Sequence, residues 1–546
     1  MRTLRCDRLR AVRGLTFGFA LTAMLLAGAL PAGAGTASPA DKPKYGGTFV
    51  VAIVNDPTSL NPATSSDFYV KIISGTVFDT LVNLDFNFNP VPRLAKSWDI
   101  SKDGLTYTFH LANAKWHDGK PVTSEDVKFT VEQVLGPLHP SGGQYKDRIQ
   151  DIQTPDPQTV VFKLKTPFGP FPVMLANDLY IVPKHVYQGT DILRNPARLT
   201  PVGTGPFKFA EWKKGDYVRV VRNPDYFMEG KPYLDEIVFK VASDAGARML
   251  AFEKGEIDYL SFYMFPASEV ERVRKIPGFR TTTKGHEIFG DILDLFFNLD
   301  KAPYNNLKVR QAIAHAIDKN YMLDKADYGL GKIATGPIPS SLPWAYTTEV
   351  TRYTHDVARA NRLLDEAGYP KNDKGIRFKT SLMWDRTVPL FTKTAEILRE
   401  QLKAVGIDLD LRPSDRPTML DLVFTKRDFD LWVHGLSTGG DPAIGIQRLY
   451  LSGNIRPAPF TNASGYRNPT VDDLFAKAAA NPDQKARAQL YHQAQKILTQ
   501  DLPIIWLLEF SDNSAWRDEF RGVHEWSAMS FYSLGETWWT KGREKP

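Results

Sequence analysis

The sequence predicts an α/β protein, because short runs of strand length take turns with longer stretches of helical periodicity. Residues 107–111 and 160–165 alternate between apolar and polar side chains, as half-buried strands do. Residues 309–317 instead carry apolar side chains at i, i+3, i+4, i+7 and i+8, the spacing of a buried helix face. At 546 residues, the chain is long enough for about three domain-sized units.

The first 34 residues predict a cleavable export signal. Five arginines make the start basic, residues 15–30 are apolar without a charge, and Ala32-Gly33-Ala34 is a small-x-small cleavage site. A membrane anchor is the alternative, but the apolar run is short for a bilayer span and ends in Pro, Ala and Gly. We therefore expect a periplasmic protein whose export signal is cleaved near Ala34.

The cysteine content and the net charge argue against a disulfide-stabilised protein and against a nucleic-acid-binding protein. The only cysteine is Cys6, inside the export signal, so the mature chain has no disulfide although its destination permits one. The formal net charge is +6, and the export signal, with five arginines and one aspartate, supplies four of these charges. The mature chain is then close to neutral, which gives no support to a nucleic-acid-binding surface.

The N-terminal third begins with a strand and contains a marked turn and helix. Residues 48–54 form an apolar run of strand length. Asp118-Gly119 signals a turn, and Thr123 or Ser124 then caps a helix with acidic residues in its first turn. Val127, Val131 and Val134 fall on one face of that helix, which we expect to be buried.

The C-terminal half continues the alternation of strands and helices. In chain order we expect a strand at 378–383, a helix at 391–405, a strand at 407–411, a short helix at 417–426, a strand at 429–433 and a helix that starts at Asn481-Pro482. The helix at 391–405 has a continuous apolar stripe, and Gly406 is its stop signal.

One motif resembles an enzymatic nucleophile. Residues 435–439 fit G-x-S-x-G, the nucleophile elbow of α/β-hydrolases, directly after a predicted strand. Acidic and histidine residues follow in the required order, namely Asp441, Asp472, His492 and His524. A secreted serine hydrolase that uses Ser437 is therefore one hypothesis. The chain continues as a loop through Gly439-Gly440, whereas an elbow enters its helix at once, so we expect Ser437 to be non-catalytic and the protein not to be an enzyme.

Several other residues are candidates for ligand contacts. Asp441-Pro442 predicts a helix start with Asp as the cap, and the helix is expected to continue through Ile444, Gln447, Arg448 and Leu451. The alternative role of Asp441 is a carboxylate for a ligand cation. Trp384 and Arg386 suit stacking and carboxylate capture, or else a packed ring and a surface ion pair. His434 ends a strand, where a structural role is the commoner one. We find no cluster of metal ligands and no phosphate-binding loop, so neither a metal nor a cofactor is expected.

A series of motifs resembles those of one protein family, in the same order. Residues 116–127 have the form W-x-D-G-x-P-(hydrophobic)-T-(small)-(acidic)-D-V, and residues 46–62 match GGT-(strand)-x-x-P-x-x-L-(D/N)-P. Residues 203–207 match G-T-G-P-(aromatic), 222–227 match R-N-P-x-Y-(aromatic), and 297–312 resemble the family's F-N…V-R-x-A segment. On these motifs the chain resembles the family 5 extracytoplasmic solute-binding proteins, which deliver ligands to bacterial ABC importers.

The resemblance implies a two-lobed periplasmic binding protein fold, type II-like with an extra inserted subdomain, and a ligand cleft between the lobes. Lobe I is expected over 45–296 with the insertion at about 80–195, lobe II over 297–504, and a C-terminal return to lobe I over 505–546. Two crossings, near 294–300 and 503–510, are expected to act as a hinge. The implied function is a monomer that passes a peptide or peptide-like solute to an ABC permease and its ATPase. A ligand sensor without a permease is the alternative.

The resemblance also has an implication for the charge of the ligand. Peptide-binding members carry a cleft Asp that pairs with the amino terminus of the peptide, four residues before a loop Pro. That position here is Thr438, which can hydrogen-bond an ammonium but cannot neutralise it. A zwitterionic peptide is therefore disfavoured relative to a differently bound peptide, an amide, a sugar or an opine-like compound. The candidate ligand-binding residues are Ser66, Trp384, Arg386, His434, Gly435, Ser437, Thr438 and Asp441.

Overall fold

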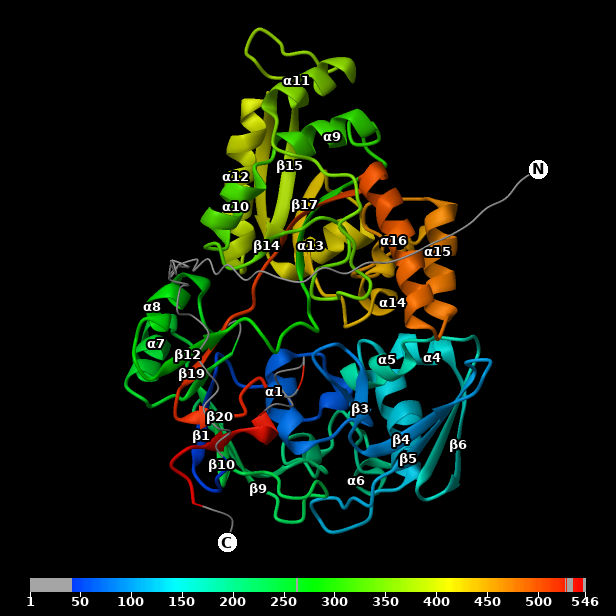
Figure 1. The fold of residues 1–546 in the computed structure, drawn as a ribbon, viewed down its shortest axis with the longest axis vertical. Helices are drawn as coiled ribbons and strands as arrows, with labels where there is room; N and C mark the ends of the chain where they lie inside the picture. Colours follow the sequence, from blue (N-terminus) through cyan, green and yellow to red (C-terminus); the bar gives the residue numbers. More distant parts are fainter. Residues whose placement is uncertain (1–41, 262–263, 526, 528–533, 544–546) are drawn as a thin grey trace, which may run out of the picture. The chain divides into compact units, whose positions relative to one another are not determined.

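A computed structural model describes residues 42–261, 264–525, 527 and 534–543 (Figure 1). The chain divides into a unit that ends at Lys42 and one compact unit over Pro43–Pro546. The predicted export signal, residues 1–34, lies outside the described residues. In the part of the chain that is described, no helix is both long enough and apolar enough to cross a membrane.

The first large sheet has seven strands with β1 at its centre. In spatial order these are β12 (Phe279–Thr282), β19 (Ser514–Arg517), β11 (Tyr259–Leu260), β1 (Thr48–Ile53), β10 (Glu236–Val241), β9 (Tyr217–Arg222) and β8 (Phe207–Lys213). β1 pairs in parallel with β10 and β11, and four of its six residues are buried, which confirms the predicted strand at 48–54. Because β19 comes from the C-terminal segment, that segment returns to the sheet that contains β1.

The second large sheet has six strands. In spatial order these are β14 (Lys332–Ile333), β18 (Ile504–Glu509), β13 (Ile292–Phe297), β17 (Leu431–Leu436), β15 (Phe378–Asp385) and β16 (Ile407–Ser414). We call residues 292–509, which carry this sheet, lobe II, and the other described residues from 43 to 543 lobe I. The strands predicted at 378–383, 407–411 and 429–433 are confirmed, with ends that differ by up to three residues.

The helices of lobe II include those predicted at 309–317 and 391–405 and others that the sequence analysis did not predict. They are α9 (Leu307–Ala316), α10 (Lys319–Ala326), α11 (Val357–Glu366), α12 (Pro389–Ala404), α13 (Arg416–Leu420), α14 (Pro442–Gly445), α15 (Pro469–Ala480) and α16 (Gln484–Asp501). The stripe of α12 is buried from Phe391 to Leu402, and Gly406 follows the helix with a φ of +85°, as a stop glycine should. The helix that was expected to start at Asn481-Pro482 instead starts at Gln484, because the Asp483 carboxylate caps it by accepting from the Ala486 N–H.

The crossings between the two sheets differ from the predicted positions. Strands β13 and β18 both lie wholly within the six-stranded sheet, so the chain passes between the sheets at 283–291 and at 510–513. The predicted crossings near 294–300 and 503–510 fall largely on these strands. The physical reason is that both strands are almost entirely buried in the sheet, where each has a neighbour on either side.

A smaller antiparallel sheet lies within residues 95–164. Its strands, in spatial order, are β4 (Ala95–Ile100), β5 (Thr106–Leu111), β7 (Thr159–Leu164) and β6 (Ile149–Asp156). Between β5 and β6 lies the predicted turn and helix, α2 (Ser124–Phe129), which continues as a π-helical segment over Thr130–Leu135. Thr123 is its cap, with Asp126 completing a capping box, and all three valines of the predicted face are buried.

Further short elements complete lobe I. They are α1 (Phe68–Val77), β2 (Val82–Leu84), β3 (Pro90–Pro92), α3 (Gly136–Leu138), α4 (Gly142–Arg148), α5 (Phe171–Asp178), α6 (Lys184–Tyr187), α7 (Ala245–Glu253), α8 (Val270–Arg274), β20 (Phe520–Arg521) and β21 (Trp538–Trp539). In Figure 1, α1, α4 and α5 lie on the side of lobe I that faces lobe II, and α14 lies on the opposing side of lobe II.

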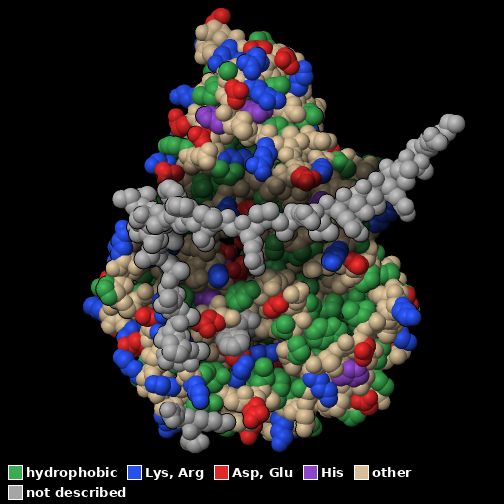
Figure 2. Space-filling model, in the orientation of Figure 1, with side chains coloured by type: hydrophobic (Ala, Val, Ile, Leu, Met, Phe, Trp, Pro, Cys, Tyr) green, Lys and Arg blue, Asp and Glu red, His purple; other side chains and the backbone are tan. Residues whose placement is uncertain are grey.

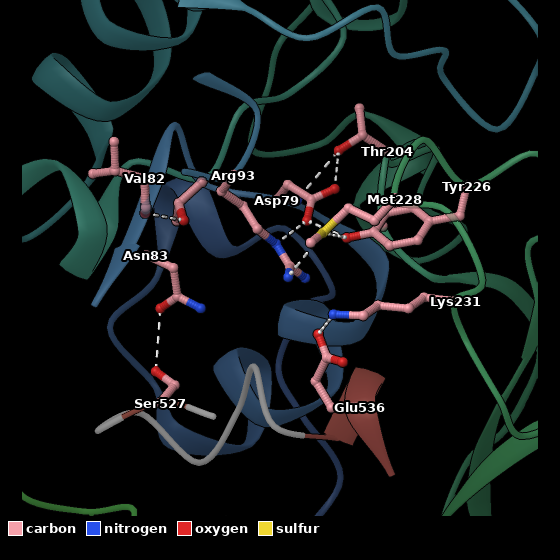
Figure 3. Close-up of polar contacts among 12 residues, drawn as sticks. Asp79, Val82, Asn83, Arg93, Thr204, Tyr226, Met228, Lys231, Ser527 and Glu536 are labelled. Atoms are coloured by element: carbon pink, nitrogen blue, oxygen red, sulfur yellow. Dashed lines mark hydrogen bonds and ion pairs between the residues drawn. The ribbon is translucent and has the colours of Figure 1, made fainter. Parts of the chain in front are cut away.

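A buried polar network ties distant segments of lobe I together (Figure 3). The Arg93 Nε donates to the Asp79 carboxylate at 2.6 Å, and this carboxylate also accepts from the hydroxyls of Thr204 and Tyr226. Beside it, the Lys231 Nζ lies 2.6 Å from the Glu536 carboxylate, which comes from the C-terminal segment. Because a buried charge needs a partner, these contacts join residues 79 and 93 to residues 204 and 226, and the C-terminal segment to Lys231.

Candidate functional site

A cavity of about 310 Å³ lies between the two lobes. Its lining comes from α1, α4 and α5 of lobe I, from Ile288 and Phe289 of the first crossing, and from residues between 437 and 448 of lobe II. On the face drawn in Figure 2, the surface is hollowed between the region of the six-stranded sheet, above, and that of the seven-stranded sheet, below. A pocket of this size that is shared by two lobes suits one small solute.

The lobe I wall of the cavity carries a paired lysine. The Asp67 carboxylate caps α1 by accepting from the Tyr69 and Val70 N–H groups, so Ser66 and Lys71 lie on either side of the first helical residues. The Lys71 Nζ is 2.6 Å from the Asp178 carboxylate at the end of α5. Burial works to raise the pKa of Asp178, but the charges of Lys71 and His139 and the hydrogen bonds from Lys71 and Ser141 together hold that pKa at about 2. This pair is therefore ionised and internally neutralised.

The two lobes touch at the rim of the cavity. The Asn177 Nδ2 of α5 donates to the Gly439 carbonyl oxygen of lobe II at 2.9 Å. The next residue, Gly440, has a φ of +78°, and a Cβ there would lie 2.6 Å from the Ile288 side chain. A glycine is required because the lobe II loop passes directly against the first crossing.

Two of the predicted site residues, Ser66 and Ser437, line the cavity. The Ser437 hydroxyl donates to the Ile288 carbonyl oxygen at 3.4 Å and accepts from the Gly439 N–H at 3.2 Å. Among the described residues, no histidine forms a hydrogen bond with it. The chain after Ser437 is a loop, as predicted, and the helix that follows it, α14, has only four residues.

Thr438 and Asp441 lie beside the cavity but are buried within lobe II. The Thr438 hydroxyl donates to the Ile288 carbonyl oxygen and accepts from the Gly440 N–H. The Asp441 carboxylate accepts from the Ala443 N–H at 2.9 Å, which confirms the predicted cap, and from the Arg487 Nη2 at 2.6 Å. The helix expected to continue through 444–451 is interrupted, because α14 ends at Gly445 and a separate 3-10 turn covers Gln447–Leu449.

The remaining predicted residues are not among those that line the cavity. Trp384 is buried inside β15, where its Nε1 donates to the Thr392 hydroxyl at 2.9 Å, and Arg386 is exposed after the strand. His434 is buried between aromatic rings, and burial lowers its pKa to about 3, so it is neutral. A Cβ at Gly435 would lie 2.8 Å from the Phe510 ring. These residues pack lobe II around the site.

Lys71, Asn177 and Arg448 are among the polar residues of the cavity lining that sequence reasoning missed. Lys71 and Asn177 lie on helices whose orientation towards lobe II depends on the fold, and no local pattern marks them. The sequence predicts a continuous helix through Arg448, which gives this residue no distinctive position. Its appearance in the cavity follows from the break in that helix at Gly445.

A second cavity, of about 230 Å³, lies within lobe II alone. Lys319 lines it, and its Nζ donates to the Trp506 carbonyl oxygen at 2.6 Å and to that of Ala334 at 3.3 Å. Since only one lobe lines it and its lysine already has protein partners, the cavity between the lobes is the better candidate. Within the described residues, no group of three or more His, Cys, Asp or Glu is placed to hold a metal ion.

The model of the bacterial extracellular solute-binding proteins, family 5, matches residues 89–456. The chain belongs to this family. It is 28% identical over 516 residues to the oligopeptide-binding protein AppA of Bacillus subtilis, covering 92% of this chain and 93% of AppA. It is 31% identical over 473 residues to a putative ABC transporter peptide-binding protein of Brucella ovis, covering 82% of this chain and 83% of that protein.

Solved structures match the fold of nearly the whole chain. The ABC transporter substrate-binding protein CtaP of Listeria monocytogenes has a TM-score of 0.78 at 29% identity, and the match covers 91% of this chain and all of CtaP. The structure of AppA of B. subtilis in complex with a nonapeptide has a TM-score of 0.75 at 26% identity, covering 92% of this chain and 100% of AppA. The predicted α/β periplasmic binding protein fold is thus confirmed, and the protein is an extracytoplasmic substrate-binding component of ABC import.

Proposed function

We propose that this protein captures a peptide or peptide-like small solute in the cavity between its lobes and delivers it to an ABC permease driven by an ATPase. The observation that carries the proposal is the cavity itself, because α1 and α5 of lobe I and the 437–448 segment of lobe II line it together. A solute bound there contacts both lobes at once, which is how closure of two lobes is coupled to binding.

The solute class is supported by two observations. The relatives AppA and the Brucella ovis protein are named for oligopeptide and peptide binding, and AppA has been solved with a nonapeptide. The cavity here, at about 310 Å³, lies at the small end of ligand pockets and favours a solute of di- or tripeptide size. Ser66, Asn177 and Ser437 offer the polar groups that would fix its orientation.

Release and delivery depend on movement of lobe II against lobe I. The chain crosses between the sheets at 283–291 and 510–513, and two such segments can serve as a hinge. The domain boundaries we propose are accordingly lobe I over 45–291, with its insertion at about 80–195, lobe II over 292–509, and the C-terminal return from 510. The protein acts as a periplasmic monomer after its export signal is removed near Ala34.

The protein binds its solute without converting it. The Ser437 hydroxyl is held by the Ile288 carbonyl oxygen and the Gly439 N–H, an arrangement that leaves it without a general base among the described residues. This supports a binding role over the serine hydrolase hypothesis. Adjacent importer genes would separate transport from a role as a ligand sensor.

A thermal-shift screen followed by calorimetry tests the proposal. The panel contains free, N-acetylated and C-amidated di- and tripeptides, sugars and opine-type compounds, since any ligand of the folded state raises the melting temperature. We expect at least one peptide-like member to bind, and Asn177→Ala to weaken it while the exposed control Asn87→Ala does not. Binding that is equal in both variants, or a panel without any binder, contradicts the proposal.

A further inference from the structure

The lobe II wall of the cavity presents one guanidinium whose charge has no close counterpart. Arg448 follows α14 in the 3-10 turn Gln447–Leu449, and it lines the cavity. Its Nε donates to the Gly445 carbonyl oxygen at 2.9 Å, which uses one of its five N–H donors. Among the described residues, no carboxylate lies within 4.0 Å of its guanidinium nitrogens.

The neighbouring cations differ from Arg448 in this respect. Lys71, on the opposite wall, is paired with Asp178 at 2.6 Å. Arg487, behind the wall, is paired with Asp441 at 2.6 Å. Among the described residues that line the cavity, Lys71 and Arg448 are the cations and Asp178 is the only carboxylate, so one of the two cations has no carboxylate partner in the lining. A solute with one negative charge complements this wall.

An aromatic stack holds Arg448 in place. Its Cζ lies 5.8 Å from the centroid of the Phe460 ring, and that ring stacks on His434 at 6.0 Å with an interplanar angle of 16°. His434 in turn stacks on Trp432 at 4.8 Å. Phe460 has a φ of +62°, a left-handed backbone conformation that is strained for a bulky residue. Strain of this kind persists where the surrounding structure holds the residue, and here it keeps an aromatic face beside the guanidinium.

The protonation state of Arg448 also suits the binding of an anion. Burial lowers the pKa of Arg448 to about 10, with Asp291 acting against that effect from beyond ion-pair distance. The guanidinium is therefore still charged near neutral pH. A ligand anion is attracted more strongly to a cation that is partly removed from water and has no adjacent carboxylate than to an exposed or already paired cation.

Resting on the proposed function, we propose that Arg448 binds a carboxylate of the solute, so that the cavity selects peptide-like solutes with a net negative charge. Asn177 and the two cavity serines then contact the uncharged part of the solute. His434, predicted from sequence as a ligand contact, becomes a positioning residue that acts through Phe460. Asp178 and Asp441 are already paired with Lys71 and Arg487, so neither carboxylate is left to balance an ammonium of the solute.

Calorimetry at pH 7 on matched probes tests this proposal. The probes are eight N-acetyl dipeptides with a free carboxylate, their C-terminal amides, and the corresponding unacetylated zwitterions. We expect the free acids to bind best, and loss of the carboxylate to weaken binding about ten- to a hundredfold. Arg448→Gln should weaken the acids by the same factor and leave the amides unchanged. Arg448→Lys should give an intermediate loss, because it keeps the charge but not the planar fork.

The control is Arg399→Gln, a charge removal at an exposed position of α12 in the same lobe, which should leave every affinity unchanged. Melting curves that coincide with wild type show that the Arg448 variants are folded. Amides or zwitterions that bind as well as the acids, or acids that bind Arg448→Gln at wild-type strength, overturn the inference while leaving solute capture intact. A panel without any binder contradicts the proposed function, and the inference falls with it.

Discussion

The Asp441–Arg487 pair provides the sharpest test of whether Asp441 is structural or a ligand contact. Both side chains are almost fully buried, and the Arg487 Nη2 lies 2.6 Å from the Asp441 Oδ1. Arg487 also donates to the Ala478 carbonyl oxygen and lies 5.0 Å from the Trp344 ring centroid, so it cannot move to water without disturbing α15. Although burial acts to lower the pKa of Arg487, Asp441 raises it above its ordinary value.

We predict that Asp441→Asn lowers the free energy of unfolding by about 3 kcal/mol. Removing one partner of a buried ion pair costs roughly 3–5 kcal/mol, and Asn, which still offers a carbonyl oxygen, should give a loss at the lower end. Asn is as good a helix cap as Asp, so the cap of α14 contributes little to the difference. The matched control is Asp473→Asn, which breaks an exposed pair of similar length, 2.7 Å to Lys477, and should cost at most about 0.5 kcal/mol.

Urea unfolding followed by tryptophan fluorescence and circular dichroism measures both losses on the same scale. A further variant, Asp441→Leu combined with Arg487→Met, should recover part of the loss, because it leaves no unpaired charge in the interior. If Asp441→Asn is no more destabilising than Asp473→Asn, and instead abolishes solute binding, then Asp441 belongs to the ligand site and the structural assignment is wrong.

Three further predictions follow from the described residues and the sequence. Burial raises the pKa of Asp327 from 3.8 to about 7, so the folded state binds this proton more tightly than the unfolded state does, and stability falls as the pH rises through this window. The free energy of unfolding should therefore be roughly 2 kcal/mol lower at pH 8 than at pH 5, and Asp327→Asn should remove this difference. The same pH dependence of stability in both proteins would contradict the prediction. Wild-type protein should hydrolyse no model ester or amide, whereas a rate that disappears in Ser437→Ala would establish the hydrolase hypothesis. N-terminal sequencing of exported protein should begin at or near Gly35, and an intact Met1 in that protein would disprove cleavage.

Local sequence signals predicted the elements of the fold where they are strong. The helix cap at Thr123, the stop glycine at 406 and the apolar stripe of α12 all lie where the sequence indicates, because each depends on neighbouring residues alone. The exact crossings between the sheets were not predictable from such signals. A buried strand such as β13 looks the same in sequence whichever sheet it joins, so its partner strands decide where the lobe begins.

The candidate site was predictable only in part, for a related reason. Ser437 lies on a loop marked by glycines, and it lines the cavity. Thr438 and Asp441 belong to the same loop, but their side chains turn into lobe II, where a carbonyl oxygen and Arg487 hold them. Asn177 and Arg448 come from segments more than 250 residues apart and meet at the cavity through tertiary packing, which no local pattern records.

A crystal structure of the protein with the tightest-binding member of the solute panel tests the central claim most directly. The account predicts one solute in the cavity between the lobes, in contact with Asn177 of lobe I and with Ser437 and Arg448 of lobe II, and its acid group against the Arg448 guanidinium. A solute held by one lobe alone, in the cavity beside Lys319 or on the outer surface, would contradict the claim that the two lobes capture it together.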